Sequence, residues 1–222
     1  MSLTVSGDRG SILSRQLAVG TYFFAVASGF GSVDGDPAPA RTLQRLGEEL
    51  ARRGRHDRFR RFCAKPKRVG RVLASAVSAV NAYVHGRSAS HADYVTAACS
   101  LTAALVVENR AYLLHAGSTQ GYLARGGALV VLTQREAFDG DAGLPVLVNA
   151  LGMAPEMRLS ISTFTLQKGD ALVLRGAPDR LLIVRCEELA AASKPSSWRW
   201  NPKLVLRGAI AAGAFFAMLC IH

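Results

Sequence analysis

Cys99, Ser118 and His115 are side chains of the types that carry out nucleophilic catalysis. His115 lies three residues before Ser118, so it could serve as the base for a serine or cysteine nucleophile. The surrounding pattern puts His115 at the end of an expected strand and Ser118 in the turn that follows, and side chains so placed rarely align for that role. We therefore interpret them as a strand-end histidine near a turn serine.

A second group, His85, His91 and Asp93, has the loose spacing of metal ligands. It follows a helical pattern in a Gly-Arg-Ser loop, and we interpret it as solvated loop polarity rather than a zinc site. The cysteines lie too far apart for a Cys-x-x-Cys pair, and we expect free, buried thiols in a reducing, intracellular setting. They are Cys63, Cys99, Cys186 and Cys220.

Residues 52–71 hold most of the charge of the chain. They include ten basic side chains and one acid, so they supply +9 of a formal net charge of +11. Three interpretations stay open: a solvated helix face and loop, contact with an anionic membrane, or nucleic-acid binding. The sequence favours the last least, because phenylalanines in a helical pattern more often belong to a core than to a base-stacking platform. The basic residues are Arg52, Arg53, Arg55, Arg58, Arg60, Arg61, Lys65, Lys67, Arg68 and Arg71.

The elements expected in the first half of the chain are a strand and two helices. The first strong apolar run, Tyr22–Ala27, predicts a buried strand that ends in a Gly-rich turn. Leucines at helical spacing predict a helix over Arg41–Arg53, and an apolar stripe predicts a second one from Val69 to Gly86. We expect these two helices to pair.

The second half of the chain has strand patterns at short intervals. The first four predict a meander of antiparallel strands. A loop at 136–145 and a short helical stretch at Val146–Leu151 follow, and Gly169-Asp170 marks a turn between the later strands. Early helices and late strands predict one α+β domain. The expected strands are Leu101–Val107, Ala111–His115, Gln120–Ala124, Ala128–Thr133, Arg158–Leu166, Ala171–Leu174 and Arg180–Cys186.

The end of the sequence is apolar. Residues 204–222 include fourteen uncharged residues from Gly208 to Ile221, close to the lower limit for a membrane-spanning helix. Trp198, Trp200 and nearby basic residues precede this stretch as an interfacial belt and positive flank would. We predict a membrane-anchor helix at 204–222 after a linker at 190–203, with the domain on the cytoplasmic side; a buried core helix is the alternative.

Small residues in the same stretch are relevant to whether two copies of this helix pair. Gly208, Ala209, Ala212 and Gly213 form small-x-x-x-small pairs, which let two membrane helices approach closely and suggest a homodimer. At the other end of the chain, MSLTVSGDRGS has no apolar run behind its charges, so we expect no signal peptide.

Three stretches in order resemble the motifs of the PPM (protein phosphatase 2C-type) serine/threonine phosphatases. Phe24–Gly31 is similar to the strand of that family that ends in Asp-Gly-x-Gly. Ser100–Thr133 is similar to its hairpin pair with Asn-Arg, Gly-Asp-Ser-Arg, Tyr-Leu and Leu-Thr. Ala150–Leu174 resembles its Leu-Gly segment, Gly-Asp turn and the strand that leads to Ser-Asp-Gly.

The resemblance covers roughly residues 5–187 and implies a domain over residues 1–189. The implied fold is an α-β-β-α sandwich of antiparallel sheets flanked by paired helices, with a C-terminal hydrophobic helix added. In that family, carboxylates at one end of the sandwich hold two Mg²⁺ or Mn²⁺ ions, which activate a bridging water for attack on a phosphate.

The carboxylates of that site are replaced in this sequence. Ser28 and Gly29 stand for the Asp-Gly, and Ser118 stands for the Asp of Gly-Asp-Ser-Arg. Ser-Asp-Gly reads Arg175-Gly176-Ala177, and Asp179 is the one acid left as a candidate. The phosphate-binding arginine of the family has no match in register, and Arg15 is the candidate for an offset substitute.

These substitutions predict a pseudophosphatase without a cofactor, tethered to the membrane and binding a protein or phosphoprotein. One alternative is an active or residual phosphatase, with Mg²⁺ or Mn²⁺ held by a non-standard site. A third hypothesis is an assembly subunit held by its anchor. Beyond Asp179, the acids open to the residual enzyme are Asp34, Asp36, Asp139 and Asp141.

Overall fold

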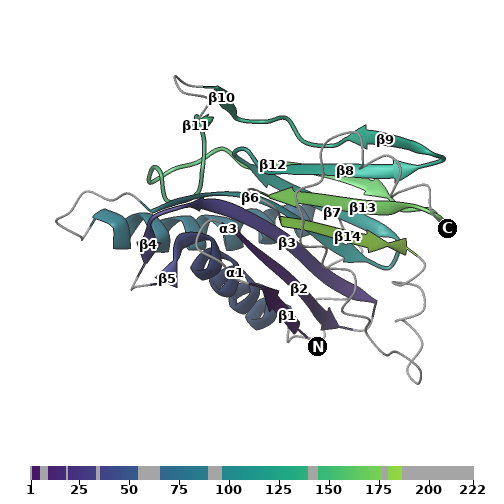
Figure 1. Cartoon of the computed structure of the whole chain (residues 1–222). Coiled ribbons are helices and arrows are strands. Elements are labelled where there is room, and N and C mark those ends of the chain that lie inside the picture. Colours follow the sequence, from purple (N-terminus) through teal and green to yellow (C-terminus); the bar gives the residue numbers. More distant parts are fainter. Residues whose placement is uncertain are drawn as a thin grey trace.

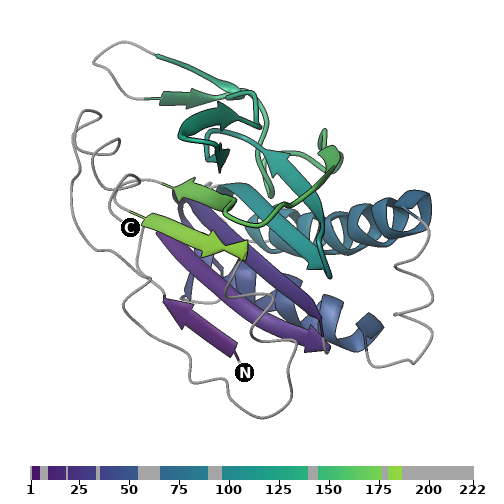
Figure 2. The ribbon, with the colours of Figure 1, turned by 90° about the vertical axis from the view of Figure 1, so that its right-hand side faces the viewer.

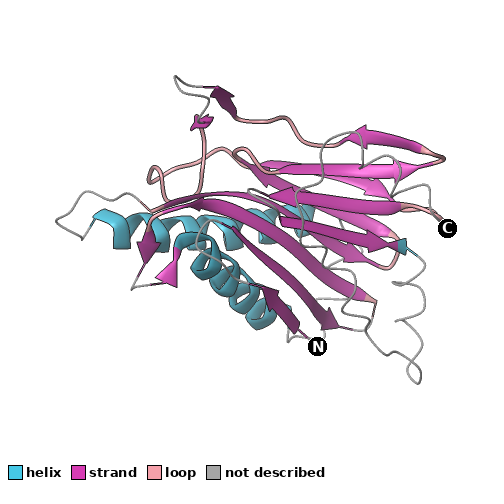
Figure 3. Cartoon of the chain, viewed as in Figure 1, coloured by secondary structure: helices cyan, strands magenta, loops and turns pink. Residues whose placement is uncertain are grey.

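A six-stranded sheet and a four-stranded sheet face each other, and two helices cover the outer side of the larger sheet (Figures 1 and 3). All strand pairs are antiparallel, as in an α+β domain. The computed structural model describes residues 2–5, 10–18, 20–33, 36–54, 66–89, 97–139, 145–176 and 180–186.

The six-stranded sheet has the order β1-β2-β3-β6-β7-β12. No strand was predicted before Tyr22, so β1 and β2 were missed. In Gly10–Ala18, polar residues interrupt the apolar ones. The expected turn at Ser28–Gly31 also starts later than predicted, since β3 continues to Phe30. The strands are β1 (Ser2–Val5), β2 (Gly10–Ala18), β3 (Thr21–Phe30), β6 (Ala98–Val107), β7 (Arg110–Ala116) and β12 (Ser160–Thr165).

The four-stranded sheet has the order β14-β13-β8-β9. The predicted four-stranded meander is wrong, because β7 and β8 belong to different sheets and the turn between them carries the chain across the sandwich. The two hairpins within that stretch, β6-β7 and β8-β9, are confirmed. The strands are β8 (Gln120–Arg125), β9 (Ala128–Val131), β13 (Ala171–Gly176) and β14 (Arg180–Arg185).

The helices α1 (Ala38–Gly54) and α3 (Pro66–Ala89) confirm the two predicted helices and their pairing. Leu43, Leu46 and Leu50 on α1 are buried in one core with the apolar stripe of α3. The guanidinium of Arg45 lies 4.2 Å from the centre of the Tyr83 ring, which joins the two helices at their outer surface.

Two apolar layers hold the domain together. One lies between the helices and the six-stranded sheet, and the other lies between the two sheets. Figure 2 shows the helices on one side of the large sheet and β13 and β14 on the other. The expected α-β-β-α sandwich has helices on the outer side of both sheets. Within the described ranges, the helices α1 and α3 both lie on the six-stranded sheet.

The predicted helical stretch at Val146–Leu151 is wrong. Its first part forms β11 (Pro145–Leu147), which pairs with β10 (Ala137–Asp139), and its last residue forms a bridge with Cys99. Short apolar runs do not distinguish helix from strand by periodicity alone, which explains the error. A second small pair, β4 (Ser32–Val33) and β5 (Asp36–Pro37), connects β3 to α1.

No helix within the described part of the chain is both long enough and apolar enough to cross a bilayer. The expected linker at 190–203 and the expected anchor helix at 204–222 lie outside the described residues.

Candidate functional site

Three small residues lie side by side on adjacent strands at one end of the sandwich. Gly10 on β2 is opposite Ser28 on β3, and Ser28 is opposite Ser100 on β6. Side chains directly opposite on antiparallel strands point to the same face of the sheet. Val26 and Ala104, two and four residues along these strands, belong to the layer between the sheets, so Ser28 and Ser100 face that layer too.

Ser118 joins this group from the turn after β7. Its backbone N–H donates to Ser100 Oγ at 2.9 Å, and the two hydroxyl oxygens are 3.0 Å apart. The structure therefore brings the two predicted site serines, Ser28 and Ser118, to the same end of the sandwich, with Ser100 between them. Ser100 was not among the predicted site residues, although its place at the start of the second resembling stretch was a signal.

The opposite sheet closes this end with β13 and β14. A Cβ added to Gly176 would lie 2.6 Å from Ser28 Oγ, so a side chain at 176 would require the Ser28 hydroxyl to move. Arg180, four residues on, donates from Nε to the carbonyl of Gly10 at 3.1 Å. Asp179, the remaining acid predicted for this site, lies outside the described residues.

Gly29 has a structural role in this arrangement. A Cβ at this position would lie 2.1 Å from the carbonyl oxygen of Ala98 and 2.7 Å from Cys99 Cα. Both contacts are with backbone, which has little freedom to move aside. Gly29 therefore lets β3 and β6 stay paired up to Phe30.

A buried hydrogen-bond chain continues the polar layer beside Ser100. His115 Nε2 lies 2.7 Å from the Gln134 carbonyl, which can only accept, so Nε2 carries a proton. Nδ1 of the neutral ring then accepts from Thr102 Oγ1 at 3.0 Å, and Thr102 accepts from Thr119 Oγ1 at 2.7 Å. The side chains of Thr102, His115 and Thr119 in this chain are all buried.

Neither candidate nucleophile is activated. Burial lowers the pKa of His115, and both of its ring nitrogens are engaged with Thr102 and Gln134 rather than with Ser118. Burial raises the pKa of the Cys99 thiol to about 12, and its Sγ donates to Thr42 Oγ1 at 3.1 Å. The interpretation of these residues as structural agrees with this geometry. Cys186 is a partly exposed free thiol.

Among the described residues, the side chains that converge at this end lack the carboxylates that a pair of divalent metal ions prefers. Mg²⁺ and Mn²⁺ prefer carboxylates, and the positions that converge here carry hydroxyls and glycines. Within the described ranges, no three His, Cys, Asp or Glu side chains gather closely enough to hold a metal ion. Glu136 does approach the Ser118 turn, but its Oε2 accepts from the Gly117 N–H at 2.9 Å and from Asn149 Nδ2 at 2.6 Å.

Arg15 does not serve this end of the molecule. It lies opposite Phe23, five positions along β3 from Ser28, and its Nη1 donates to the Gly47 carbonyl on α1 at 3.1 Å. The prediction of Arg15 as an offset phosphate-binding arginine is therefore wrong. Arg180, by contrast, does reach the Gly10 end.

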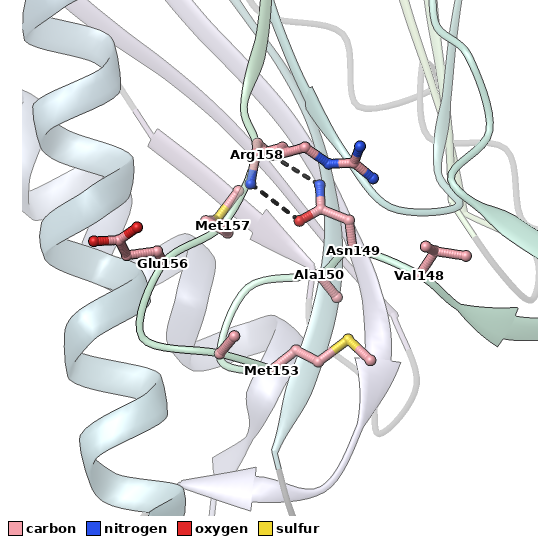
Figure 4. A pocket seen from close by; sticks show the side chains of 8 residues that line it. Val148, Asn149, Ala150, Met153, Glu156, Met157 and Arg158 are labelled. Carbon is pink, nitrogen blue, oxygen red and sulfur yellow. Dashed lines mark hydrogen bonds between the residues drawn. The ribbon is translucent and has the colours of Figure 1, made fainter.

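A pocket of about 300 Å³ lies beside the Ser118 turn (Figure 4). Asn149 connects the two, because its Nδ2 bonds both Glu136 and the Arg158 carbonyl. Figure 4 shows the Asn149 side chain held against the Arg158 backbone, with thioether and aliphatic side chains around the opening. The pocket is lined by Val148, Asn149, Ala150, Met153, Ala154, Glu156, Met157 and Arg158.

Helix α3 anchors the loop that forms this pocket. Asn81 donates to the carbonyls of Ala154 and Pro155 at 2.9 and 3.0 Å, and it accepts from the Gly152 N–H at 2.8 Å. His85 Nδ1 lies 3.1 Å from the Gly152 carbonyl. His85 is thus part of this anchor, while His91 and Asp93 of the rejected zinc group lie outside the described residues.

The predicted basic patch is described in part. Arg52 and Arg53 lie at the end of α1, and three further members begin α3. Five members, Arg55, Arg58, Arg60, Arg61 and Lys65, lie outside the described residues.

Solved structures of bacterial phosphatases share this architecture. The S. agalactiae serine/threonine phosphatase superposes with a TM-score of 0.65 at 15% identity, over 88% of this chain and 86% of its own. The PPM Ser-Thr phosphatase MsPP from Mycobacterium smegmatis, in complex with cacodylate, gives 0.57 at 20% identity, over 88% and 85%. The chain has the fold of the PPM phosphatases. The M. tuberculosis phosphatase PstP/Ppp gives 0.53 at 22% identity, over 78% and 70%.

The PPM-type fold predicted from the three resembling stretches is therefore confirmed. No protein-family model matches the sequence, and no curated protein matches it either. In this PPM fold, Ser28, Ser118 and Gly176 are the positions that the resemblance assigned to acids, and they meet at one end of the sandwich.

Proposed function

We propose that this chain is a pseudophosphatase: a PPM-fold domain, tethered to a membrane by residues 204–222, that binds a protein or phosphoprotein without metal-dependent hydrolysis. The observation that carries the proposal is the polar layer at the Ser28 end. There the hydroxyls of Ser100 and Ser118 bond each other, and Gly176 lies against the Ser28 hydroxyl, where a Cβ would be only 2.6 Å from Oγ.

The energetics of this layer support the loss of hydrolysis. A neutral hydroxyl is a weak ligand for Mg²⁺ or Mn²⁺. These ions lose bound water when they enter a protein site, and the ligands must offset the free-energy cost of that loss. Ser100 accepts from the Ser118 N–H, and Thr102 is bonded to both His115 and Thr119. A metal ion would have to break these bonds and would gain no negative charge from the same residues.

Exposed apolar side chains beside this end support a protein partner. Phe138 and Val146 lie opposite each other on β10 and β11, and Val148 and Met153 follow at the pocket. Between 44% and 57% of each of these four residues is exposed. Apolar side chains grouped beside a hydrogen-bonded pocket are typical of a surface that binds another protein.

Hydrolysis is tested by incubating the full chain, in mild detergent, with phosphothreonine peptides and Mn²⁺ or Mg²⁺. We expect phosphate release no faster than in the buffer blank, with an active PPM phosphatase as the positive control. Turnover that EDTA abolishes would contradict the proposal and would favour the residual phosphatase instead.

The tether is tested separately by deleting residues 204–222 and fractionating cells that express either chain. We expect the full chain in the membrane fraction and the shortened chain to leave it. Equal membrane association of both chains would overturn the tether and leave the statement about hydrolysis intact.

A further inference from the structure

Exposed basic side chains gather where the two helices meet. α1 ends and α3 begins at the same end of the molecule, and Arg53 Nη2 on α1 lies 3.4 Å from Ser75 Oγ on α3. Ser75 is one helical turn from Arg71, so the basic residues of both helices share one surface. We call this surface the basic end; it comprises Arg52, Arg53, Lys67, Arg68 and Arg71.

The acids near this surface neutralise only its α1 side. Glu49 binds Arg52 at 2.7 Å and Arg53 at 2.6 Å. The first turn of α3 contains no acid, although cations at a helix N-terminus are electrostatically unfavourable because of the helix dipole. The three basic residues of α3, Lys67, Arg68 and Arg71, are exposed.

The described chain also leaves the domain at this end. β14 runs from Arg180, beside Gly10, to Arg185, which pairs with Ala171 at the far end of β13. The N–H of Cys186 then donates to the Asp170 carbonyl at 3.0 Å. Figure 1 shows the arrowhead of β14 at the end opposite β4 and β5. The described chain thus ends with Cys186 at the same end of the domain as the basic end, and residues 187–203 separate it in sequence from the hydrophobic stretch 204–222.

We propose that the basic end is a contact surface for the anionic headgroups of a lipid bilayer. The Ser28 end then faces away from the membrane, at the other end of a strand that is itself about 30 Å long. The charged surface itself is formed by α1 and α3 alone. The inference rests on the proposed tether only for which end of the domain faces the membrane. This orientation leaves the pocket beside Ser118 accessible to a partner.

The range of electrostatic forces supports this orientation. Attraction to an anionic membrane falls off within about 8 Å at physiological ionic strength, so basic residues at the Ser28 end would not contribute. Nucleic acid fits the surface less well, because binding of single strands uses exposed aromatic rings. Among the described residues the exposed aromatic side chain is Phe138, and it lies beside the pocket.

The test is vesicle flotation with the full chain. It compares neutral phosphatidylcholine vesicles with the same vesicles containing phosphatidylglycerol. The variant Lys67→Gln/Arg68→Gln/Arg71→Gln removes three charges from the basic end. The control Arg87→Gln/Arg135→Gln/Arg158→Gln removes three exposed charges from the Ser28 end. We expect the wild type and the control to prefer anionic vesicles, and the first variant to lose on the order of a hundredfold of that preference.

Raised salt gives a second readout, since about 1 M salt shortens the screening length to about 3 Å and should abolish the preference of the wild type. Anionic binding without neutral binding would support the basic end while contradicting the hydrophobic tether. Equal binding of the wild type to both vesicles, or equal losses in the two triple variants, would overturn the inference. Binding of a single-stranded RNA that displaces the vesicles and is lost in the same variant would also overturn it.

Discussion

Ser100 and Thr102 determine how the residues of the candidate site are held. They lie two positions apart on β6 and face the layer between the sheets, where Ser100 binds Ser118 and Thr102 binds His115. Polar groups buried this deeply cost free energy unless they are paired, and here hydroxyls and one neutral ring pair with each other. In the described part of the chain, the polar side chains that meet here form a hydrogen-bond network of hydroxyls and a neutral ring, with the Glu136 carboxylate bonded beside it.

The neutral state of His115 makes the stability of the domain depend on pH. Burial lowers the pKa of His115 below its usual 6.5, so the unfolded chain binds a proton that the folded chain does not. The free energy of unfolding should therefore fall as the pH drops below about 6.5, and level off below the folded-state pKa. Urea unfolding at about pH 7.5 and 5.5 measures this. His115→Gln should show a shallower fall, and an unchanged fall would contradict this role.

Gly29 allows the close approach of β3 and β6, and Gly29→Ala should destabilise the domain. Its Cβ would overlap the Ala98 backbone, and overpacking of this kind costs about 1–3 kcal/mol or more. Gly70→Ala is the matched control, because no atom lies within 4 Å of its added Cβ and alanine favours the helix by about 1 kcal/mol. Urea midpoints of the two variants should move in opposite directions; similar midpoints would show that the strands can move aside.

At the scale of elements, α3 connects the helical layer to the candidate site. Asn81 and His85 lie one helical turn apart and hold the Gly152–Pro155 loop, which forms part of the pocket. The position of the pocket therefore depends on how α3 packs, and that packing depends on the apolar stripe that predicted the helix.

Asn81→Leu should loosen this loop without unfolding the domain. Leucine has a similar shape but leaves the Gly152 N–H and two carbonyls without their partner, at a cost of about 1–3 kcal/mol. Hydrogen exchange at residues 150–158 should become faster, while exchange in β6 and β7 should not change. Ser78→Ala, at an exposed position on the same helix, is the control. Protection of the loop equal to that of the wild type would contradict the anchor.

The elements with regular apolar spacing were predictable from the sequence. The leucines of α1 and the stripe of α3 each bury one helix face, and the late strands β13 and β14 are short apolar runs; both signals are local. β2 was not predictable in this way, because Arg15 and Gln16 interrupt it. The assignment of β7 and β8 to different sheets also depends on contacts across the sandwich, which periodicity does not contain.

In the candidate site, too, local sequence predicted some residues, whereas others depend on contacts between distant strands. The resembling motifs identified Ser28 and Ser118, because each motif is local. They did not identify Ser100, which lies opposite Ser28 only once β3 and β6 pair. Arg15 was assigned to the site from its distance along the chain from Gly10, and the register of β2 with β3 moved it away. Strand pairing thus determined which residues meet.

At the scale of the whole molecule, the PPM fold separates two surfaces. The Ser28 end carries the polar layer and the pocket, and the opposite end is the basic end, formed by the last residues of α1 and the first turns of α3. A chain that used metal-dependent hydrolysis would need acids at the first of these ends. In the described part of the chain, the positions that meet there are glycines and serines.

Calorimetric titration of the full chain, in mild detergent, with Mn²⁺ tests the central claim most directly. An active PPM phosphatase titrated under the same conditions is the positive control. The uncharged layer around Ser28, Ser100 and Ser118 predicts no saturable heat of binding beyond the dilution blank. Micromolar, stoichiometric Mn²⁺ binding would contradict it.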